Sequence, residues 1–244
     1  MESESRNALI VGGANGIGLA IAYQLADYDR VYIIDKATPE EALPANACFE
    51  QFDLTTADYS IFDRYQDISL LMITAGFGRL QHFSDIPEDF IISTFQVNTI
   101  AAIRVVKHYY DHLQHDKYLL CGVMVSIAVF LSIPLFSVYG ASKAALRIFI
   151  ESVNVELEKT GSTNKILNIS PGSIKGTRFN GGNNELCETE ALAKEIVAHL
   201  KAKDDLFIPK YDEVYHDVLE RYHKDFRAEG RHSYDYKMQS GRMK

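Results

Sequence analysis

The sequence predicts an α/β fold in which helices cover both faces of a doubly wound parallel sheet, giving three layers. Three observations lead to this prediction. Short apolar runs, each suited to one buried strand, alternate with helical patterns along residues 8–208. A glycine-rich turn joins the first run to the first helix. The length of 244 residues suits a single α/β domain with a substantial core.

The strands are expected at the continuous apolar runs, and the helices between them. A long helical region is expected over residues 87–113, and another helix over residues 190–200. The predicted strands cover residues 8–11, 31–34, 48–52, 70–73, 122–125, 165–170 and 205–208. Residues 1–208 are therefore interpreted as one catalytic or binding domain, and residues 209–244 as an extension.

Composition narrows the classes of function. Hydrophobic residues make up 47% of the chain and charged residues 24%, as is ordinary for a globular protein. A formal charge of −8 argues against binding to nucleic acid or to an anionic membrane. We find no run of about 18 apolar residues and expect no membrane span. The three cysteines are far apart and show no metal-ligand spacing, so a reducing cytoplasmic location is expected, without a metal site.

Residues 12–18 read Gly-Gly-Ala-Asn-Gly-Ile-Gly, directly between the first strand and the first helix. Glycines at such a turn let the backbone approach a pyrophosphate, and the N–H groups at the start of the helix bind its charge. Glycine turns of this kind also occur for packing reasons alone. The cofactor-binding candidates here are Gly12, Asn15, Gly16, Ile17 and Gly18.

Asp35 ends the second predicted strand, about 20 residues beyond the glycines. A carboxylate at this place accepts hydrogen bonds from the ribose hydroxyls of a dinucleotide and repels the extra phosphate of NADP. The sequence therefore predicts NAD as the cofactor, with NADP less favoured, although the neighbouring Lys36 softens that preference. The alternative interpretation is a solvated loop aspartate.

Tyr139 and Lys143 are four residues apart and lie on one face of a predicted helix. An ammonium group beside a phenol favours the phenolate, so Lys143 is expected to lower the pKa of Tyr139 and make it usable as an acid and base at neutral pH. Ser126 follows the apolar run 122–125 and is expected at the carboxyl end of a strand, where open parallel sheets bind ligands.

This combination resembles the active-site signature of the short-chain dehydrogenase/reductase family. Ser126 stands thirteen residues before Tyr139-x-x-x-Lys143, and the spacing of the glycine turn matches the variant typical of that family. The resemblance covers residues 8–208 and implies a Rossmann-like fold. The catalytic residues that it implies are Asn98, Ser126, Tyr139 and Lys143. The cofactor-binding residues that it implies are Gly12, Asn15, Gly16, Ile17, Gly18, Asp35, Asp53, Leu54, Ala75, Gly76, Tyr139, Lys143, Pro171, Gly172, Ile174 and Thr177.

The chain departs from the family pattern in two places. The family usually has asparagines where Ile73 and Thr74 stand, before Ala75 and Gly76. Thr177 lies one residue later than the usual nicotinamide-binding threonine after Pro-Gly.

Asp53 and Asn98 each admit a second interpretation. The resemblance places Asp53 against the adenine, but an aspartate here also caps a helix. From the residues alone Asn98 is a polar helix residue, whereas in the family it holds a water that relays protons from the lysine.

The resemblance implies transfer of a hydride between NAD and a small-molecule carbonyl or secondary alcohol, with Tyr139 as acid and base. A catalytically idle NAD-binding scaffold or redox-sensing regulator remains the alternative, and a dehydratase or epimerase on the same fold is a further one. The extended relatives that modify nucleotide sugars need an additional carboxyl-terminal lobe, for which the residues after 208 are too few. A homodimer or homotetramer is expected from the family only.

Three segments outside the motifs have open interpretations. The apolar stretch 127–136 forms either a wall of a substrate pocket or a contact with a second subunit. The segment 178–190, rich in glycine and asparagine, is either a lid or a surface loop. An aromatic helical stripe over residues 211–226 covers a neighbouring subunit or the pocket mouth, or simply packs on the domain, and residues 227–244 are expected to be poorly ordered.

Overall fold

The computed structural model describes residues 6–115, 118–180 and 183–240. Seven strands form one sheet in the order β3-β2-β1-β4-β5-β6-β7, and every neighbouring pair is parallel. Their bounds are β1 Asn7–Val11, β2 Arg30–Asp35, β3 Ala47–Gln51, β4 Leu70–Ile73, β5 Leu120–Met124, β6 Ile166–Ile169 and β7 Leu206–Phe207. All seven predicted strands are present, with ends that differ by at most two residues. The predicted fold class is confirmed.

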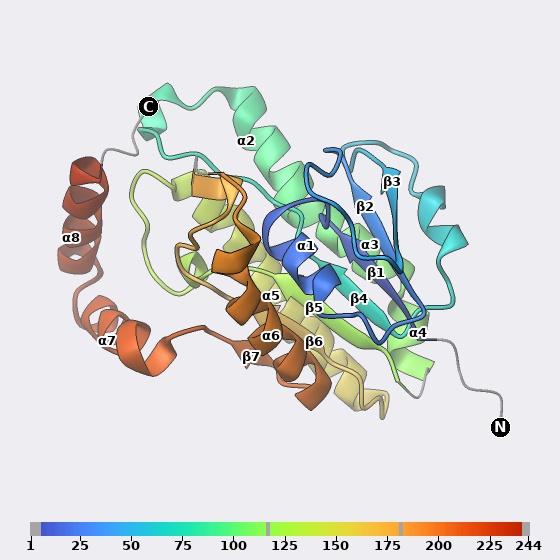
Figure 1. Ribbon diagram of the computed structural model, residues 1–244. Helices are drawn as coiled ribbons and strands as arrows, with labels where there is room; N and C mark the ends of the chain where they lie inside the picture. Colours follow the sequence, from blue (N-terminus) through green and yellow to red (C-terminus); the bar gives the residue numbers. More distant parts are fainter. Residues whose placement is uncertain (1–5, 116–117, 181–182, 241–244) are drawn as a thin grey trace.

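The sheet separates two apolar cores because successive residues of a strand point to opposite faces. In β1, Leu9 and Val11 belong to one core, and Ala8 and Ile10 belong to the other. Helices α3 and α5 cover the first face, and α1 and α6 cover the second, as Figure 1 shows. The helices run over α1 Gly16–Tyr23, α2 Glu88–Phe95, α3 Ala102–His108, α4 Tyr110–His115, α5 Ser137–Lys159, α6 Leu186–Ala202, α7 His216–Lys224 and α8 Phe226–Gln239.

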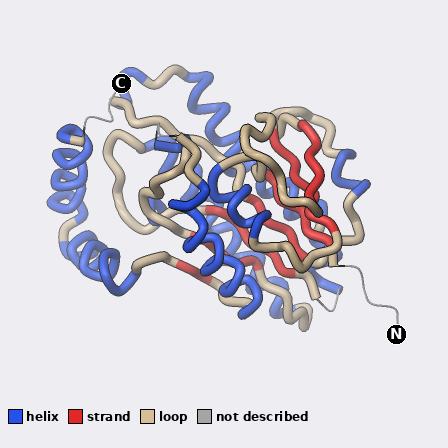
Figure 2. The backbone as a smooth tube through the Cα atoms, viewed as in Figure 1, coloured by secondary structure: helices blue, strands red, loops and turns tan. Residues whose placement is uncertain are grey.

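The order of the strands determines where a ligand can bind. The chain winds outward from β1 in one direction through β2 and β3, and returns to the other side of β1 with β4. The loops after β1 and β4 therefore leave in opposite directions and open a crevice at the carboxyl ends of these strands. Figure 2 shows the strands enclosed between helices, with the last two helices at one side of the sheet.

The predicted helix over residues 87–113 is divided into several parts. A π-helical turn, Gln96–Ala101, joins α2 to α3, and α4 follows as a separate helix. Such turns are rare and occur frequently at functional sites. Glu88–His108 is also long and apolar enough, by length and composition alone, to cross a membrane, contrary to the expectation that no such segment exists. Core helices of soluble proteins meet the same criterion, and α2 packs against α5 here.

The carboxyl-terminal extension forms two helices. A π-helical turn, Tyr211–Tyr215, leads into α7, and Asp225 separates α7 from α8 by accepting hydrogen bonds from the N–H groups of Arg227 and Ala228. The expectation of a poorly ordered segment from residue 227 is wrong for the residues that the structure describes, because this N-cap starts a helix that runs to Gln239.

Candidate active site

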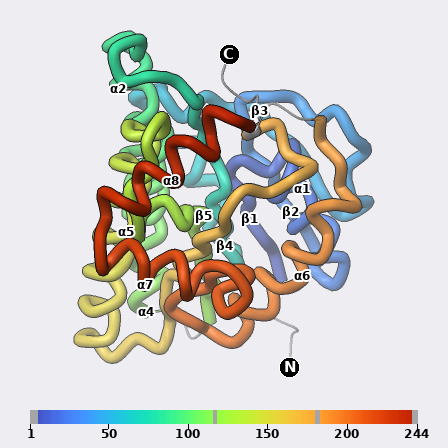
Figure 3. Tube along the Cα trace, turned by 90° about the vertical axis from the view of Figure 1, so that its left-hand side faces the viewer, coloured from blue at the N-terminus to red at the C-terminus, as the bar shows by residue number. Residues whose placement is uncertain are grey.

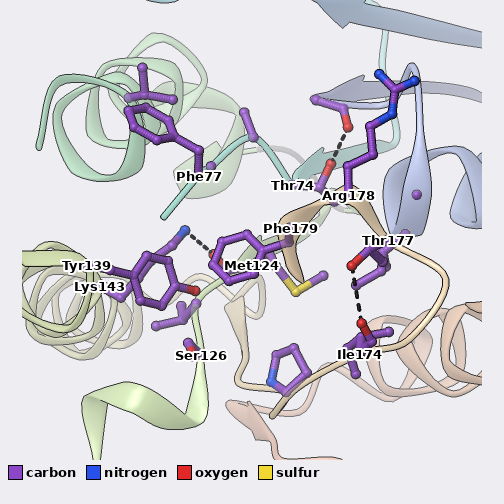
Figure 4. Close-up of a pocket in the computed structure, with 18 of the residues that line it drawn as sticks. Thr74, Phe77, Met124, Ser126, Tyr139, Lys143, Ile174, Thr177, Arg178 and Phe179 are labelled. Atoms are coloured by element: carbon purple, nitrogen blue, oxygen red, sulfur yellow. Dashed lines mark hydrogen bonds between the residues drawn. The ribbon is translucent and has the colours of Figure 1, made fainter. Parts of the chain in front are cut away.

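A cleft of 740 Å³ lies at the carboxyl ends of the strands and contains almost every residue that the sequence singled out. Its lining includes all the predicted cofactor-binding and catalytic residues except Asn98. Figure 4 shows Tyr139, Lys143 and Ser126 on one side of this cleft and Thr177 and Arg178 on the other. The same cleft is lined by Asp35 and by Tyr139, so it fits a dinucleotide with an adenosine half and a nicotinamide half.

The glycine turn needs its first glycine for steric reasons. Gly12 has a φ of +92°, and a Cβ atom there would lie 2.3 Å from the backbone N of Ala75. Thr74 holds the turn from the opposite side, since its hydroxyl donates a hydrogen bond of 2.7 Å to the carbonyl of Gly12. The threonine that departs from the family pattern therefore ties β4 to the glycine turn, a role that the sequence alone did not reveal. The backbone at Gly12 carries no side chain and lies beside the start of α1, so it is suited to binding a pyrophosphate.

The two acidic residues at the adenosine end have different environments. The carboxylate of Asp35 accepts hydrogen bonds from the N–H groups of Ala14, at 3.1 Å, and Ala37, at 3.0 Å. It is therefore held in place beside the glycine turn. Asp53 forms an ion pair of 2.7 Å with Lys36, and this pairing, with hydrogen bonds from Thr55, lowers the pKa of Asp53 to about 2. Asp53 lines the cleft, in agreement with its first interpretation. The helix-cap interpretation is wrong, because its bond to the N–H of Thr55 lies in a turn and the next helical segment begins only at Ser60.

Tyr139 and Lys143 lie in the first two turns of α5, and both side chains are buried, with exposed fractions of 8% and 3%. The Nζ atom of Lys143 donates a hydrogen bond of 2.8 Å to the carbonyl of Met124, the last residue of β5. Ser126 follows β5, as predicted, and its hydroxyl accepts from the N–H of Ala128 at 3.2 Å. The helix and the strand end thus bring the three side chains together at one end of the cleft.

The pKa values in this cluster correct one expectation. Burial raises the pKa of Tyr139 to about 12, and an interaction with Ser126 opposes that rise only in part. Burial also lowers the pKa of Lys143 to about 7. The prediction that Lys143 lowers the pKa of Tyr139 is therefore wrong for this structure: a desolvated lysine with so low a pKa carries only part of its charge at neutral pH.

Asn98 lies behind the cleft, in the π-helical turn, and is fully buried. Its side chain pairs with the backbone of Phe77: Oδ1 accepts from the N–H at 2.9 Å, and Nδ2 donates to the carbonyl at 2.8 Å. Nδ2 also donates to the hydroxyl of Ser142 on α5 at 3.1 Å. Asn98 therefore links the loop after β4 to the helix that carries Tyr139, and its water-relay role stays a prediction.

The segment after β6 lies against the glycine turn. Pro171, Gly172 and Ile174 line the cleft, and the Thr177 hydroxyl donates to the carbonyl of Ile174 at 3.2 Å. A Cβ on Gly16 would be 3.6 Å from Thr177, so the late position of this threonine still places it at the site.

Two further contacts hold the same segment. The side chain of Asn184 donates to Asn15 at 3.2 Å, and Arg178 forms an ion pair with Glu40. The proposed lid over residues 178–190 includes positions 181–182, which lie outside the described residues.

Aromatic and aliphatic side chains line the cleft around Tyr139. The rings of Phe136 and Phe179 each lie 5.1 Å from that of Tyr139, measured between centroids. Four residues of the apolar stretch 127–136 line the cleft, which supports its interpretation as a pocket wall: Ile127, Ala128, Ile133 and Phe136. The lining residues that sequence reasoning missed are Phe77, Leu80, Ser93, Val97, Arg178, Phe179, Asn184, Ser233, Tyr236 and Lys237. No motif marked them, because they come from loops, from α2 and the π-helical turn that follows it, and from α8.

The sequence predicted no metal site, and one cluster of potential ligands lies outside the cleft. His216, Asp217 and Glu220 are close together on α7, and all three are exposed. Exposed groups of this kind are common without an ion. All three cysteines are free, as expected for this spacing.

Comparison with known proteins agrees with the fold. A hydroxynaphthalene reductase, arp2, from Aspergillus fumigatus is 26% identical over 184 residues, which is 69% of this chain and 66% of that protein, slightly under two thirds of its length. A short-chain dehydrogenase from Burkholderia phymatum in complex with NAD superposes with a TM-score of 0.79 at 16% identity, covering 93% of this chain and 96% of the other. An alcohol dehydrogenase from Thermococcus sibiricus, complexed with 5-hydroxy-NADP, has a TM-score of 0.68 at 20% identity, covering 84% and 96%.

The sequence model of one family, described as short chain dehydrogenase, matches residues 6–187, well over half of the chain. This match includes the glycine turn, Asp35, Ser126, Tyr139 and Lys143. The chain therefore belongs to the short-chain dehydrogenase family of oxidoreductases.

Proposed function

We propose that this protein transfers a hydride between NAD(H) and a carbonyl or secondary alcohol, with Tyr139 as the acid and base. One observation carries the proposal: a single cleft contains the glycine turn, Asp35 and the cluster of Ser126, Tyr139 and Lys143. An enzyme needs the last three side chains, whereas a protein that only binds a dinucleotide does not.

The nicotinamide supplies or accepts the hydride, and the protein contributes position and proton transfer. Ser126 binds the substrate oxygen beside Tyr139. The pKa of Tyr139, raised to about 12 by burial, keeps this phenol protonated at neutral pH and ready to donate its proton to a carbonyl oxygen. Lys143 would hold the nicotinamide ribose, and Asn98 positions the backbone of Phe77 in the loop after β4.

Preference for NAD over NADP is part of the same proposal and is supported by Asp35. Its carboxylate is held by two backbone N–H groups at the adenosine end of the cleft, where the extra phosphate of NADP would meet its charge. The glycine turn contains no arginine or lysine. Relatives of known structure bind either nucleotide, so the affinities for NADH and NADPH decide the point. Tighter binding of NADPH would contradict this reasoning.

The experiment that tests the activity follows NADH absorbance over a panel of ketones and alcohols. We expect Tyr139→Phe to lose turnover by roughly a hundredfold or more while it still binds NADH, because only the proton donor is removed. Tyr118→Phe is the matched control, since Tyr118 is exposed and lies outside the cleft. Full turnover by Tyr139→Phe would refute the assignment.

The alternative is an idle NAD-binding scaffold, and it is favoured by the late position of Thr177 and by the absence of the family's asparagines at Ile73 and Thr74. That alternative predicts that NADH binds and that no member of the panel is turned over. A cytoplasmic location and assembly into a homodimer or homotetramer belong to our proposal as well; they rest on cysteine use and on family resemblance.

A further inference from the structure

The carboxyl-terminal extension lies beyond the segment that matches the family. That match ends at residue 187, and the extension follows β7 with the π-helical turn Tyr211–Tyr215, then α7 and α8. Figure 3, which turns this side of the molecule toward the viewer, shows α7 and α8 in front of the rest of the chain. The extension contains no recognised motif, so its part in the site depends on its contacts with the residues that line the cleft.

One side chain of the π-helical turn is turned into the protein. Residues 211–214 are exposed, whereas Tyr215 is half-buried, and burial raises the pKa of its phenol. The carbonyl of Lys210 accepts from the N–H groups of Val214 at 3.1 Å and Tyr215 at 3.4 Å, and Lys210 itself has a left-handed backbone with a φ of 58°. A non-glycine residue in this conformation persists only where its surroundings hold it. The turn therefore has a defined shape, which places Tyr215.

The Tyr215 hydroxyl occupies the place that a side chain on Gly172 would take. A Cβ atom on Gly172 would lie 1.6 Å from the hydroxyl oxygen and 2.6 Å from Cζ, and its three nearest atoms all belong to Tyr215. The φ of Gly172 is negative, so the backbone conformation does not require a glycine. Gly172 lines the cleft and Tyr215 does not, so the phenol packs against the turn from its outer side.

The turn that carries Gly172 lies at the catalytic end of the cleft. It follows β6, which is next to β5, whereas β1, β4 and β5 separate β6 from β2, the strand that ends at Asp35. The carbonyl of Pro171 accepts a hydrogen bond of 2.9 Å from the N–H of Ile127, the residue after Ser126. The turn therefore borders the half of the cleft that would hold the nicotinamide, and not the adenosine half at Asp35.

Packing by Tyr215 limits the freedom of this turn. Glycine has more backbone conformations available than any other residue, so a turn built on Gly172 without support would sample several shapes. A segment that is already held in its bound shape loses less conformational entropy when a ligand binds, and this raises the affinity without any new contact to the ligand.

Building on the proposed function, we propose that Tyr215 is a positioning residue for the cofactor. Its phenol packs against Gly172 and holds the turn after β6 in the shape that binds the nicotinamide half of NAD(H). The extension thereby contributes to cofactor affinity through a residue that does not touch the cofactor, and Gly172 is needed because Tyr215 fills the space beside it.

The first test compares NADH with ADP-ribose, which shares the adenosine and the pyrophosphate but lacks the nicotinamide. By calorimetry, we expect Tyr215→Ala to weaken NADH binding roughly tenfold and ADP-ribose binding by less than about twofold, because only the nicotinamide half meets the loosened turn. Tyr211→Ala is the matched control and should bind both ligands as the wild type does. Tyr211 is an exposed tyrosine of the same π-helical turn and does not line the cleft.

The second test approaches the same contact from Gly172. In the wild-type background, Gly172→Ala should weaken NADH binding roughly tenfold, because the new Cβ atom and the Tyr215 hydroxyl cannot both be accommodated. In the Tyr215→Ala background, the same substitution should cost less than about twofold, because the space is then free. Additive losses in the double variant would show that the two residues act independently, and would overturn the inference.

Two further outcomes would overturn the inference: wild-type affinity for NADH in Tyr215→Ala, or equal losses for NADH and ADP-ribose, which would indicate a general loosening of the fold. If urea unfolding shows that Tyr215→Ala does not fold, Tyr215→Phe takes its place, since it keeps the ring and lacks the hydroxyl. We expect this variant to lose roughly threefold in NADH affinity and to keep its ADP-ribose affinity, and an unchanged NADH affinity would again overturn the inference. These affinities need no turnover, so an absence of turnover over the ketone panel would refute the proposed hydride transfer alone.

Discussion

Replacement of Lys143 by methionine tests the burial of the active-site charge. Lys143 is 3% exposed, and burial lowers its pKa from 10.5 to about 7. A lysine that is harder to protonate in the folded state than in the unfolded state destabilises the fold at every pH where the unfolded chain is charged. The methionine variant has a side chain of similar length that carries no proton, so it lacks this effect.

The magnitude follows from the difference between the two pKa values. Each pKa unit corresponds to about 1.4 kcal/mol, so the full destabilisation is about 5 kcal/mol below pH 7, and it disappears as the pH rises to 10.5. Between pH 7 and pH 9 the unfolded state binds more protons than the folded state. Wild-type stability should therefore rise by about 2 kcal/mol relative to Lys143→Met over this interval.

Urea unfolding of both proteins at a series of pH values measures this difference. Other titrating groups are common to the two proteins and cancel in the comparison. The variant also leaves the carbonyl of Met124 without its donor, which changes the absolute stability but not its dependence on pH. Lys201→Met, at an exposed position of α6, is the control and should follow the wild type. Parallel pH profiles for wild type and Lys143→Met would refute the reasoning.

Two further predictions concern the cofactor end of the cleft. Gly12→Ala should destabilise the protein by about 3 kcal/mol or more and weaken NADH binding, because its Cβ would lie 2.3 Å from Ala75. Gly161 has a similar φ of +84°, but a Cβ atom there would have no neighbour within 4 Å. Gly161→Ala is therefore the control for backbone strain without crowding, and chemical denaturation measures the stability of both variants. Equal losses of stability in the two variants would contradict the crowding argument. Asp53→Asn should cost less than about 1 kcal/mol, because the pair with Lys36 is 40% and 75% exposed. The pKa of Asp53 is lowered to about 2, so the small contribution of this carboxylate to stability is present above pH 3.8 and lost as the pH falls toward 2. Unfolding curves of wild type and Asp53→Asn at both ends of this range measure that contribution. A loss of stability in Asp53→Asn that persists at pH 2 would contradict the reasoning.

Local patterns in the sequence determined the fold class and the main site residues. A strand of a parallel sheet is a short apolar run, and its period is visible within a few residues. Tyr139 and Lys143 share a helix face because of their spacing, and Ser126 follows a strand because the apolar run ends there. These relations span fewer than twenty residues, so the sequence alone sufficed to find them.

Contacts between distant segments determined the features of the site that the sequence did not predict. The sign of the pKa change at Tyr139 depends on burial by Phe136 and Phe179, from two different loops. The roles of Thr74 at the glycine turn and Asn98 behind Phe77 depend on hydrogen bonds across 62 and 21 positions of the chain.

The position of α8 beside the cleft depends on a contact of still greater separation in sequence. Lys237 binds Pro134 across 103 positions. Burial, desolvation and long-range hydrogen bonds arise only when the chain has folded. They depend on which distant segments become neighbours in space, and not on the residues that are adjacent in sequence. The sequence by itself therefore identified the candidate residues of the site, and the tertiary structure decided their charge, the hydrogen bonds that hold them and the contribution of α8 to the lining of the cleft.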